Sequence, residues 1–176
     1  MRGFFTLASL STTGSVSDRI STTGSVLPER EVVIAAEGSG RVIKLPVSLG
    51  SVVKKGALLA KLDSTVERAQ ARQAHANLRQ AEAALELAAS EFTRAETLHG
   101  KQAVSDLVLE QRRIQHESSE AGVEAARAGV ALAEKAVANC SLKAPFAGTV
   151  AEVQLELGAL VAPGTPSFRL VSIDRV

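Results

Sequence analysis

The side chains with the greatest chemical potential in this sequence are three histidines and one cysteine, and their spacing does not suit catalysis. His75 and His116 fall in different predicted helices, and neither they nor His99 has a second histidine four residues away, as a zinc-binding helix would require. No Ser/His/Asp arrangement or phosphate-binding loop can be defended, because the glycine-rich "EGSGRV" lacks GxGxxG spacing. Cys140 is the only cysteine, which excludes an internal disulfide and a multi-cysteine metal site. We therefore expect no catalytic residue, no metal and no cofactor.

Composition narrows the class of protein further. The chain has 176 residues, 45% of them apolar, with five Phe and no Trp or Tyr, so a folded protein rich in small residues is expected. The formal net charge is +1 with acids and bases interspersed, which excludes the basic surface of a nucleic-acid-binding protein. No apolar run reaches the roughly 20 residues that cross a bilayer, and the patch after Met1 is short for a signal peptide.

The most informative pattern is a repeat of one short segment. Glycines at 40, 50 and 56 and a leucine at 62 recur 108 residues later, as Gly148, Gly158, Gly164 and Leu170. The six glycines predict structural turns that need a positive φ or a close backbone approach. Apolar residues also match between the copies, as Val42 with Val150, Val47 with Leu155 and Val53 with Val161. A half of about 30 residues has too little core to fold alone. The repeat therefore predicts one pseudo-twofold β-sandwich from residues 31–63 and 140–174, preceded by a Ser/Thr/Gly-rich lead-in over 1–30 that is partly disordered or forms an isolated strand.

The segment between the copies, 64–139, predicts two long helices. A capping box, Ser64 with Glu67, marks the start of the first helix, Gly100 suits the position after its end at His99, and Ser105 can cap the second helix. The first helix carries a heptad seam, and two stripes on the second helix could face it. The seam consists of Ala74, Leu78, Ala81, Leu85, Ala88, Phe92 and Ala95; one stripe includes Leu107, Ile114, Ala121, Ala128 and Leu132, and the other Val123, Val130 and Val137. The fold class predicted is α+β, a split lipoyl-like β-sandwich interrupted by an antiparallel coiled-coil hairpin.

This arrangement resembles the periplasmic adaptor proteins, or membrane fusion proteins of the HlyD family, which serve tripartite efflux pumps. The segments that carry the resemblance are "GSGRVIKLPVSLGSVVKKGALLAKLD" at 38–63 and "LKAPFAGTV" at 142–150. It covers residues 22–174. Family members normally have a membrane anchor before this region and a β-barrel after it, so the resemblance implies a truncated protein.

The predicted hairpin tip is most similar to adaptors of the resistance-nodulation-division (RND) pumps. These carry an Arg, a Leu four residues on and a Ser eleven residues on, here Arg94, Leu98 and Ser105. The resemblance implies that the three residues dock on an outer-membrane channel. The family usually has a second Leu directly after the Arg, where this chain has Ala95. Each residue also has a purely structural explanation: Ser105 as a helix cap, Leu98 as the end of the seam, and Arg94 as a solvated charge.

The resemblance implies a periplasmic protein, associated with the inner membrane in its full-length form, that is not an enzyme. Its partners would be an inner-membrane transporter, an outer-membrane channel and further copies of itself in a ring. Three alternatives stay open at this point: an adaptor of an ABC-type or type I secretion exporter, a plain coiled-coil spacer, and a biotin or lipoyl carrier. The carrier is disfavoured because the hairpin replaces the turn that would hold the modified lysine. Lys54 and Lys55 lie in a different turn, and Met1 is the only methionine.

Overall fold

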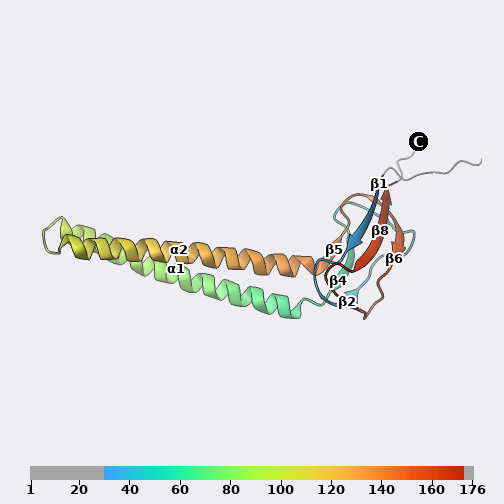
Figure 1. Ribbon diagram of the computed structural model, residues 1–176, viewed down its shortest axis with the longest axis horizontal. Helices are drawn as coiled ribbons and strands as arrows, with labels where there is room; N and C mark the ends of the chain where they lie inside the picture. Colours follow the sequence, from blue (N-terminus) through green and yellow to red (C-terminus); the bar gives the residue numbers. More distant parts are fainter. Residues whose placement is uncertain (1–29, 173–176) are drawn as a thin grey trace, which may run out of the picture.

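A computed structural model describes residues 30–172, and it consists of a long helical rod joined to a small β-domain (Figure 1). Helices α1 (Thr65–His99) and α2 (Asp106–Asn139) run antiparallel along each other and form the rod. At a rise of 1.5 Å per residue, each helix is about 50 Å long. The predicted α+β fold, a β-sandwich split by a helical hairpin, is confirmed. The lead-in over 1–29 lies outside the described residues.

The β-domain consists of two four-stranded antiparallel sheets related by a pseudo-twofold axis. One sheet has the strand order β1-β8-β6-β3, and the other has the order β5-β4-β2-β7. Each strand of the first half has its counterpart in the other sheet, so β1 corresponds to β5, β2 to β6, β3 to β7 and β4 to β8. The strands are β1 (Arg30–Ala35), β2 (Gly40–Lys44), β3 (Val52–Val53), β4 (Leu58–Leu62), β5 (Ser141–Lys143), β6 (Gly148–Val153), β7 (Leu160–Val161) and β8 (Pro166–Ser172).

Backbone hydrogen bonds exchanged between the halves hold the turns in place. The Gly50 amide donates to the Val150 carbonyl at 2.8 Å, and the Gly158 amide donates to the Val42 carbonyl at 2.9 Å. In the same way, Gly56 donates to Ala144 at 2.7 Å and Gly164 donates to Ala36 at 2.8 Å. Each half therefore satisfies the turn amides of the other half, and the two halves interlock.

One apolar core lies between the sheets and draws on both halves. Its most deeply buried side chains are Phe168, Leu59, Leu62, Leu170, Val42 and Val150. Cys140 belongs to this core at 1% exposure, and burial raises the pKa of its thiol, with the nearby Glu67 and Asp63 carboxylates acting in the same direction. A buried thiol of raised pKa reacts slowly with thiol reagents, so Cys140 reports opening of the β-domain.

Four of the six repeated glycines lie in turns with a left-handed backbone: Gly50 and Gly56 at φ 81°, Gly158 at 87° and Gly164 at 85°. For the other two, the prediction of turns was wrong, because Gly40 begins β2 and Gly148 begins β6. Close packing of the backbone requires glycine at both strand starts. A Cβ added at Gly148 would stand 2.4 Å from the Val171 carbonyl oxygen, and one at Gly40 would stand 2.9 Å from the Asp63 carbonyl oxygen.

The helix ends differ from the predicted capping. Ser64 is the N-cap residue of α1, but its buried side chain makes no capping bond, so the capping box with Glu67 does not form. The Asp63 carboxylate takes that role: its Oδ1 accepts from the Thr65 amide at 3.0 Å and from the Thr65 hydroxyl at 2.6 Å. At the other end Gly100 has φ −58°, because the chain continues in a tight helical turn and reaches positive φ at Gln102. Helix α2 extends one residue beyond the predicted end, to Asn139.

The Asp63 cap makes the stability of the protein depend on pH. The side-chain hydrogen bond from Thr65, then the backbone one, holds the pKa of Asp63 below its ordinary value of 3.8. The ionised carboxylate thus stabilises the fold above the unfolded pKa, and this contribution is lost as the pH falls through the folded pKa. We expect Asp63→Ala to lower the urea midpoint at pH 7, and the difference from the native protein to shrink near pH 3. An equal difference at both pH values would contradict this role.

The structure decides which stripe of α2 faces α1. The seam predicted on α1 is confirmed, with Ala88 and Ala95 buried in it, and α2 packs Val123 and Val130 against it. Ion pairs from His75 to Glu134 at 3.0 Å and from Arg112 to Glu91 at 2.6 Å cross between the helices. The other stripe of α2 points away from α1: Leu107 is 67% exposed and Leu132 75%. Within residues 30–172, no helix is long and apolar enough to cross a membrane.

Candidate docking site at the hairpin tip

The hairpin tip is a compact turn that leads from the end of α1 directly into α2. Amides of Lys101 and Ala103 donate to the Leu98 carbonyl at 3.1 and 2.9 Å, and the Gln102 amide donates to the His99 carbonyl at 2.8 Å. These bonds satisfy carbonyls that the end of α1 leaves without helical partners. The imidazole of His99 also lies 2.6 Å from the Asp106 carboxylate, which joins the two helix ends. The tip is therefore fixed by local bonds and presents a defined surface.

A shallow depression of about 180 Å³ lies beside this turn, between the two helices. Its apolar lining comes from Leu98, Val104 and Val108, with Ala95 between the helices. Its charged lining consists of Arg94, Glu91 and Arg112. The structure thus brings Arg94 and Leu98 into one surface, while Ser105 is not part of the lining. The sequence analysis did not identify Val104 and Val108, although their spacing of four residues at the start of α2 was a usable signal.

The charged groups around the depression are not equivalent. Glu91 and Arg112 neutralise each other across the hairpin, with their Oε2 and NH1 atoms 2.6 Å apart. Arg94 takes part in none of the ion pairs formed within residues 30–172. An exposed guanidinium without a counter-ion offers up to five hydrogen-bond donors to carbonyl or carboxylate oxygens of a partner. The depression therefore combines an apolar floor with one available cation.

Ser105 occupies the N-cap position of α2 with an extended backbone, at φ −80° and ψ 159°. Its carbonyl accepts from the Val108 and Leu109 amides at 3.0 and 3.2 Å, but its side chain makes no capping hydrogen bond. The predicted position is thus occupied, whereas the predicted side-chain cap is not formed. The exposed hydroxyl is left available to a partner.

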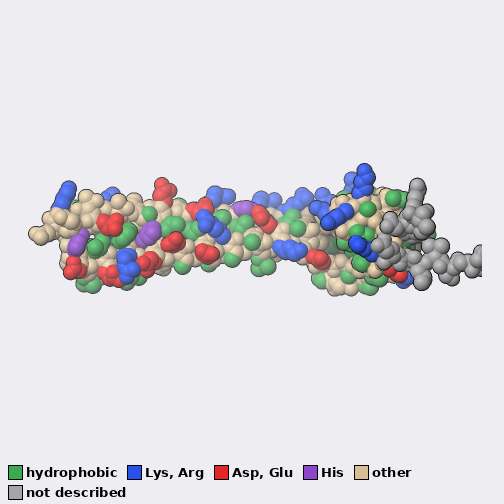
Figure 2. Space-filling view, turned by 90° about the horizontal axis from the view of Figure 1, so that it is seen from above, with side chains coloured by type: hydrophobic (Ala, Val, Ile, Leu, Met, Phe, Trp, Pro, Cys, Tyr) green, Lys and Arg blue, Asp and Glu red, His purple; other side chains and the backbone are tan. Residues whose placement is uncertain are grey.

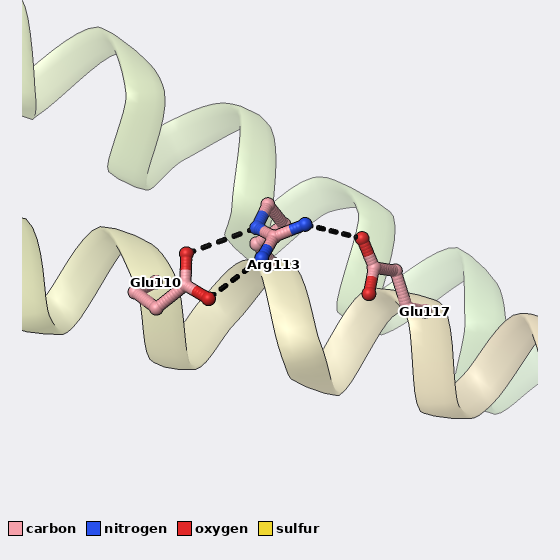
Figure 3. Close-up of polar contacts among 3 residues, drawn as sticks. All are labelled: Glu110, Arg113 and Glu117. Atoms are coloured by element: carbon pink, nitrogen blue, oxygen red, sulfur yellow. Dashed lines mark hydrogen bonds and ion pairs between the residues drawn. The ribbon is translucent and has the colours of Figure 1, made fainter.

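On α2, the polar groups next to the tip pair along the helix. The Arg113 guanidinium bridges Glu110, at 2.6 and 2.9 Å, and Glu117, at 2.8 Å (Figure 3). The hydrogen bond from Arg113 lowers the pKa of Glu110, and Glu110 in turn raises the pKa of Arg113. This network keeps the flank of the rod charged over a wide pH range, and acids and bases alternate along its surface (Figure 2).

The residues considered first for chemistry do not converge. His75 pairs with Glu134, His99 with Asp106, and the His116 ring stacks on Phe92 with centroids 5.8 Å apart. Among the described residues no group of three metal-ligating side chains comes together. What the tip can do with its side chains is bind a helix or a loop, through an apolar depression, a guanidinium and a hydroxyl.

Comparison with protein families decides the identity. Residues 30–173 match the family described as "RND MFP, barrel-sandwich hybrid domain", that is, the membrane fusion proteins of RND pumps. The chain belongs to the RND membrane fusion protein family. The suspected family is thereby confirmed, and the split sandwich with its inserted hairpin is the barrel-sandwich hybrid domain of that family.

Curated relatives agree with membership of the RND membrane fusion proteins. The nickel-cobalt-cadmium resistance protein NccB of Alcaligenes xylosoxydans xylosoxydans is 30% identical over 155 residues, which cover 86% of this chain and 38% of that protein. The multidrug resistance protein MdtA of Photorhabdus laumondii is 24% identical, over 84% of this chain and 37% of its own length. The chain therefore spans well under half the length of these relatives.

Solved structures show the same fold. A MacA–MexA chimeric protein that contains the α-hairpin domain of Pseudomonas aeruginosa MexA superimposes with a TM-score of 0.64 at 26% identity, over 83% of this chain and 49% of that one. ZneB from Cupriavidus metallidurans superimposes with a TM-score of 0.60 at 20% identity, over 83% of this chain and 62% of that one, which shows the fold alone.

Proposed function

We propose that this RND membrane fusion protein is a periplasmic adaptor that links an inner-membrane efflux pump to an outer-membrane channel, with the hairpin tip as its channel-docking end. The observation that carries the proposal is the tip itself: an apolar depression with the unpaired Arg94 guanidinium lies at the far end of a rod about 50 Å long. The β-domain at the other end spaces this surface away from the pump. The role is mechanical, without catalysis or cofactor, and in the full-length form the protein is held at the inner membrane.

The chemistry of the tip suits the end of a helical hairpin in the channel. Leu98, Val104 and Val108 would cover an apolar side chain of the partner, and Arg94 would bind the carbonyls that its helix end leaves unpaired. The Ser105 hydroxyl would add one hydrogen bond at the edge. A contact of this size is small for one copy, so several copies of the adaptor would act together on one channel. An adaptor of an ABC-type exporter would use the same surface, and the identity of the pump partner would separate the two.

The tip is tested in the full-length protein, in a strain that depends on it for efflux. We expect Arg94→Ala, Leu98→Ala and Ser105→Ala each to weaken docking, by about tenfold or more for Arg94, since a central arginine is often an interface hot spot. The readouts are resistance to the exported compound and cross-linking of the tip to the channel. Melting temperature and helicity should stay close to native, because Arg94 is exposed and the Ser105 side chain makes no cap bond.

Arg68→Ala, at the base of the same helix, is the matched control and should leave both readouts unchanged. Full resistance and cross-linking in all three tip variants would refute docking through these residues. A large loss of stability in Ser105→Ala would instead assign that residue a structural role.

A further inference from the structure

The outer surface of α2 carries an apolar face that nothing in the described chain covers. The outer α2 face consists of Leu107, Ile114, Ala121, Ala125, Ala128 and Leu132, all of them exposed. Leu107 and Leu132 are 67% and 75% exposed, and Ile114 is 53% exposed. From Ile114 to Leu132 the positions on this face also include Ser118, Gly122 and Gly129, and none of them is charged. On a rod whose other surfaces carry many charges, such a face is typical of an interface.

Helix α1 has a second apolar face as well, on the side opposite its seam. The outer α1 face consists of Ala69, Ala76, Ala83 and Leu87; Ala76 is half-buried, and the other three are exposed. Ala69, Ala76 and Ala83 follow one another at heptad spacing, as Leu107, Ile114, Ala121 and Ala128 do on α2. Residues seven apart share a helix face, so each outer face suits the groove of another helix.

We propose that the outer α2 face packs against the outer α1 face of a second copy of this chain, with both hairpins pointing the same way. This inference rests on the proposed adaptor function and names the surfaces through which its copies meet. The same contact has a different face on each copy, so it is heterologous and propagates from one copy to the next.

The heights of the residues along the rod favour this partner. The pairs His75–Glu134, Glu82–Arg127 and Glu91–Arg112 mark residues of α1 and α2 at equal height. For two hairpins in parallel, Leu132 of one copy then lies within a turn of Ala76 of the next. Leu87 lies within a turn of Ala121, so at both levels a large side chain meets a small one, as close helix packing requires.

The charges at the tip end agree with this pairing. On the same scale, Glu110 of one copy lies at the height of Arg94 of the next, so opposite charges would meet at the edge of the contact. A parallel pairing of α2 with α2 would instead place Glu110 opposite Glu110 and Leu132 opposite Leu132. That arrangement brings like charges together and loses the match of large with small residues.

Alanine-to-glutamate substitutions test the contact with controls on the same helices. Ala128→Glu and Ala83→Glu place a charge in the two outer faces, whereas Ala131→Glu and Ala84→Glu place it at exposed positions beside them. In sedimentation experiments up to millimolar concentration, we expect the first pair to weaken self-association about tenfold or more and the second pair to leave it unchanged. The melting temperature of the monomer should be close to native in all four, because every site is exposed.

Cysteine pairs identify the partner face. When chains with Ala76→Cys are mixed with chains with Leu132→Cys, we expect a disulfide that joins the two kinds of chain, since the buried Cys140 does not compete. Disulfide between two Leu132→Cys chains alone, equal weakening by all four glutamates, or a native chain that stays monomeric at millimolar concentration would overturn the proposal. Ser105→Ala separates this contact from channel docking: it should reduce efflux while leaving self-association intact.

Discussion

Replacing Phe168 by alanine is expected to lower the free energy of unfolding of the β-domain by about 3–5 kcal/mol. Phe168 is 1% exposed and is the largest of the fully buried side chains in the core between the sheets. Its removal takes apolar surface out of the core and leaves a cavity that β1 and β6, which flank β8, cannot close without breaking their ladders. A small domain is stable by only about 5–15 kcal/mol, so this one change removes a large part of the total.

The measurement uses the thiol of Cys140, because the chain has no Trp or Tyr and circular dichroism is dominated by the helices. In the native protein the buried thiol reacts with a disulfide reagent only after the β-domain opens, so the rate of reaction reports the opening equilibrium. We expect the Phe168→Ala rate to rise by at least about 100-fold, which corresponds to roughly 3 kcal/mol. Phe146→Ala is the matched control: Phe146 packs against the edge of the core and is only partly buried, so its loss should be smaller. Similar rates in both variants would show that the core is not centred on Phe168.

Much of the fold could be predicted from the sequence, because the strongest constraints act on residues close together or repeated. Leu59, Leu62 and Leu170 repeat in both halves the apolar positions that one shared core requires. The helices could be predicted in the same way, from an uninterrupted heptad seam and the lack of proline. Helix capping was less predictable. Asp63 lies one residue before the serine that fits the capping pattern, and whether Ser64 is exposed depends on how α1 leaves the β-domain.

The remaining differences come from tertiary contacts that a single helix or turn does not encode. Both stripes of α2 are apolar, and the choice between them depends on how the helix is rotated against α1. Gly148 is needed because of a carbonyl on β8, a strand that begins 18 residues later in the sequence. At the tip, Val104 and Val108 meet Leu98 because the turn reaches positive φ at Gln102, a position where glycine would have been the usual indication. Arg94, Leu98 and Ser105 were selected by resemblance to a family, and their role as a docking site stays a prediction.

The interlocked β-domain leads to the other large effect: neither half is expected to fold without its partner. If the chain is cut between Lys101 and Gln102, one fragment carries β1–β4 with α1, and the other carries α2 with β5–β8. Each fragment would keep strands from both sheets but lose the neighbours that complete them, because β8 pairs with β1 and β4 pairs with β5. The turn amides of Gly158 and Gly164 would also lose their acceptors, the carbonyls of Val42 and Ala36. Half of a small core cannot offset the conformational entropy of ordering the strands.

Cys140 lies in the second fragment, so its reactivity again gives the answer. Alone, that fragment should react at nearly the rate of the urea-unfolded chain; mixed with the first fragment, it should regain protection of about 100-fold or more. The helices favour reassembly, since the α1–α2 seam brings the two cut ends together and raises the effective concentration of the β-halves. Ala88→Asp, which buries a charge in that seam, should weaken reassembly, whereas Ala84→Asp, at an exposed position on the same helix, should not. A second fragment protected on its own would show that the halves are independent domains, and the exchanged turn bonds would then be a consequence of docking rather than a condition of folding.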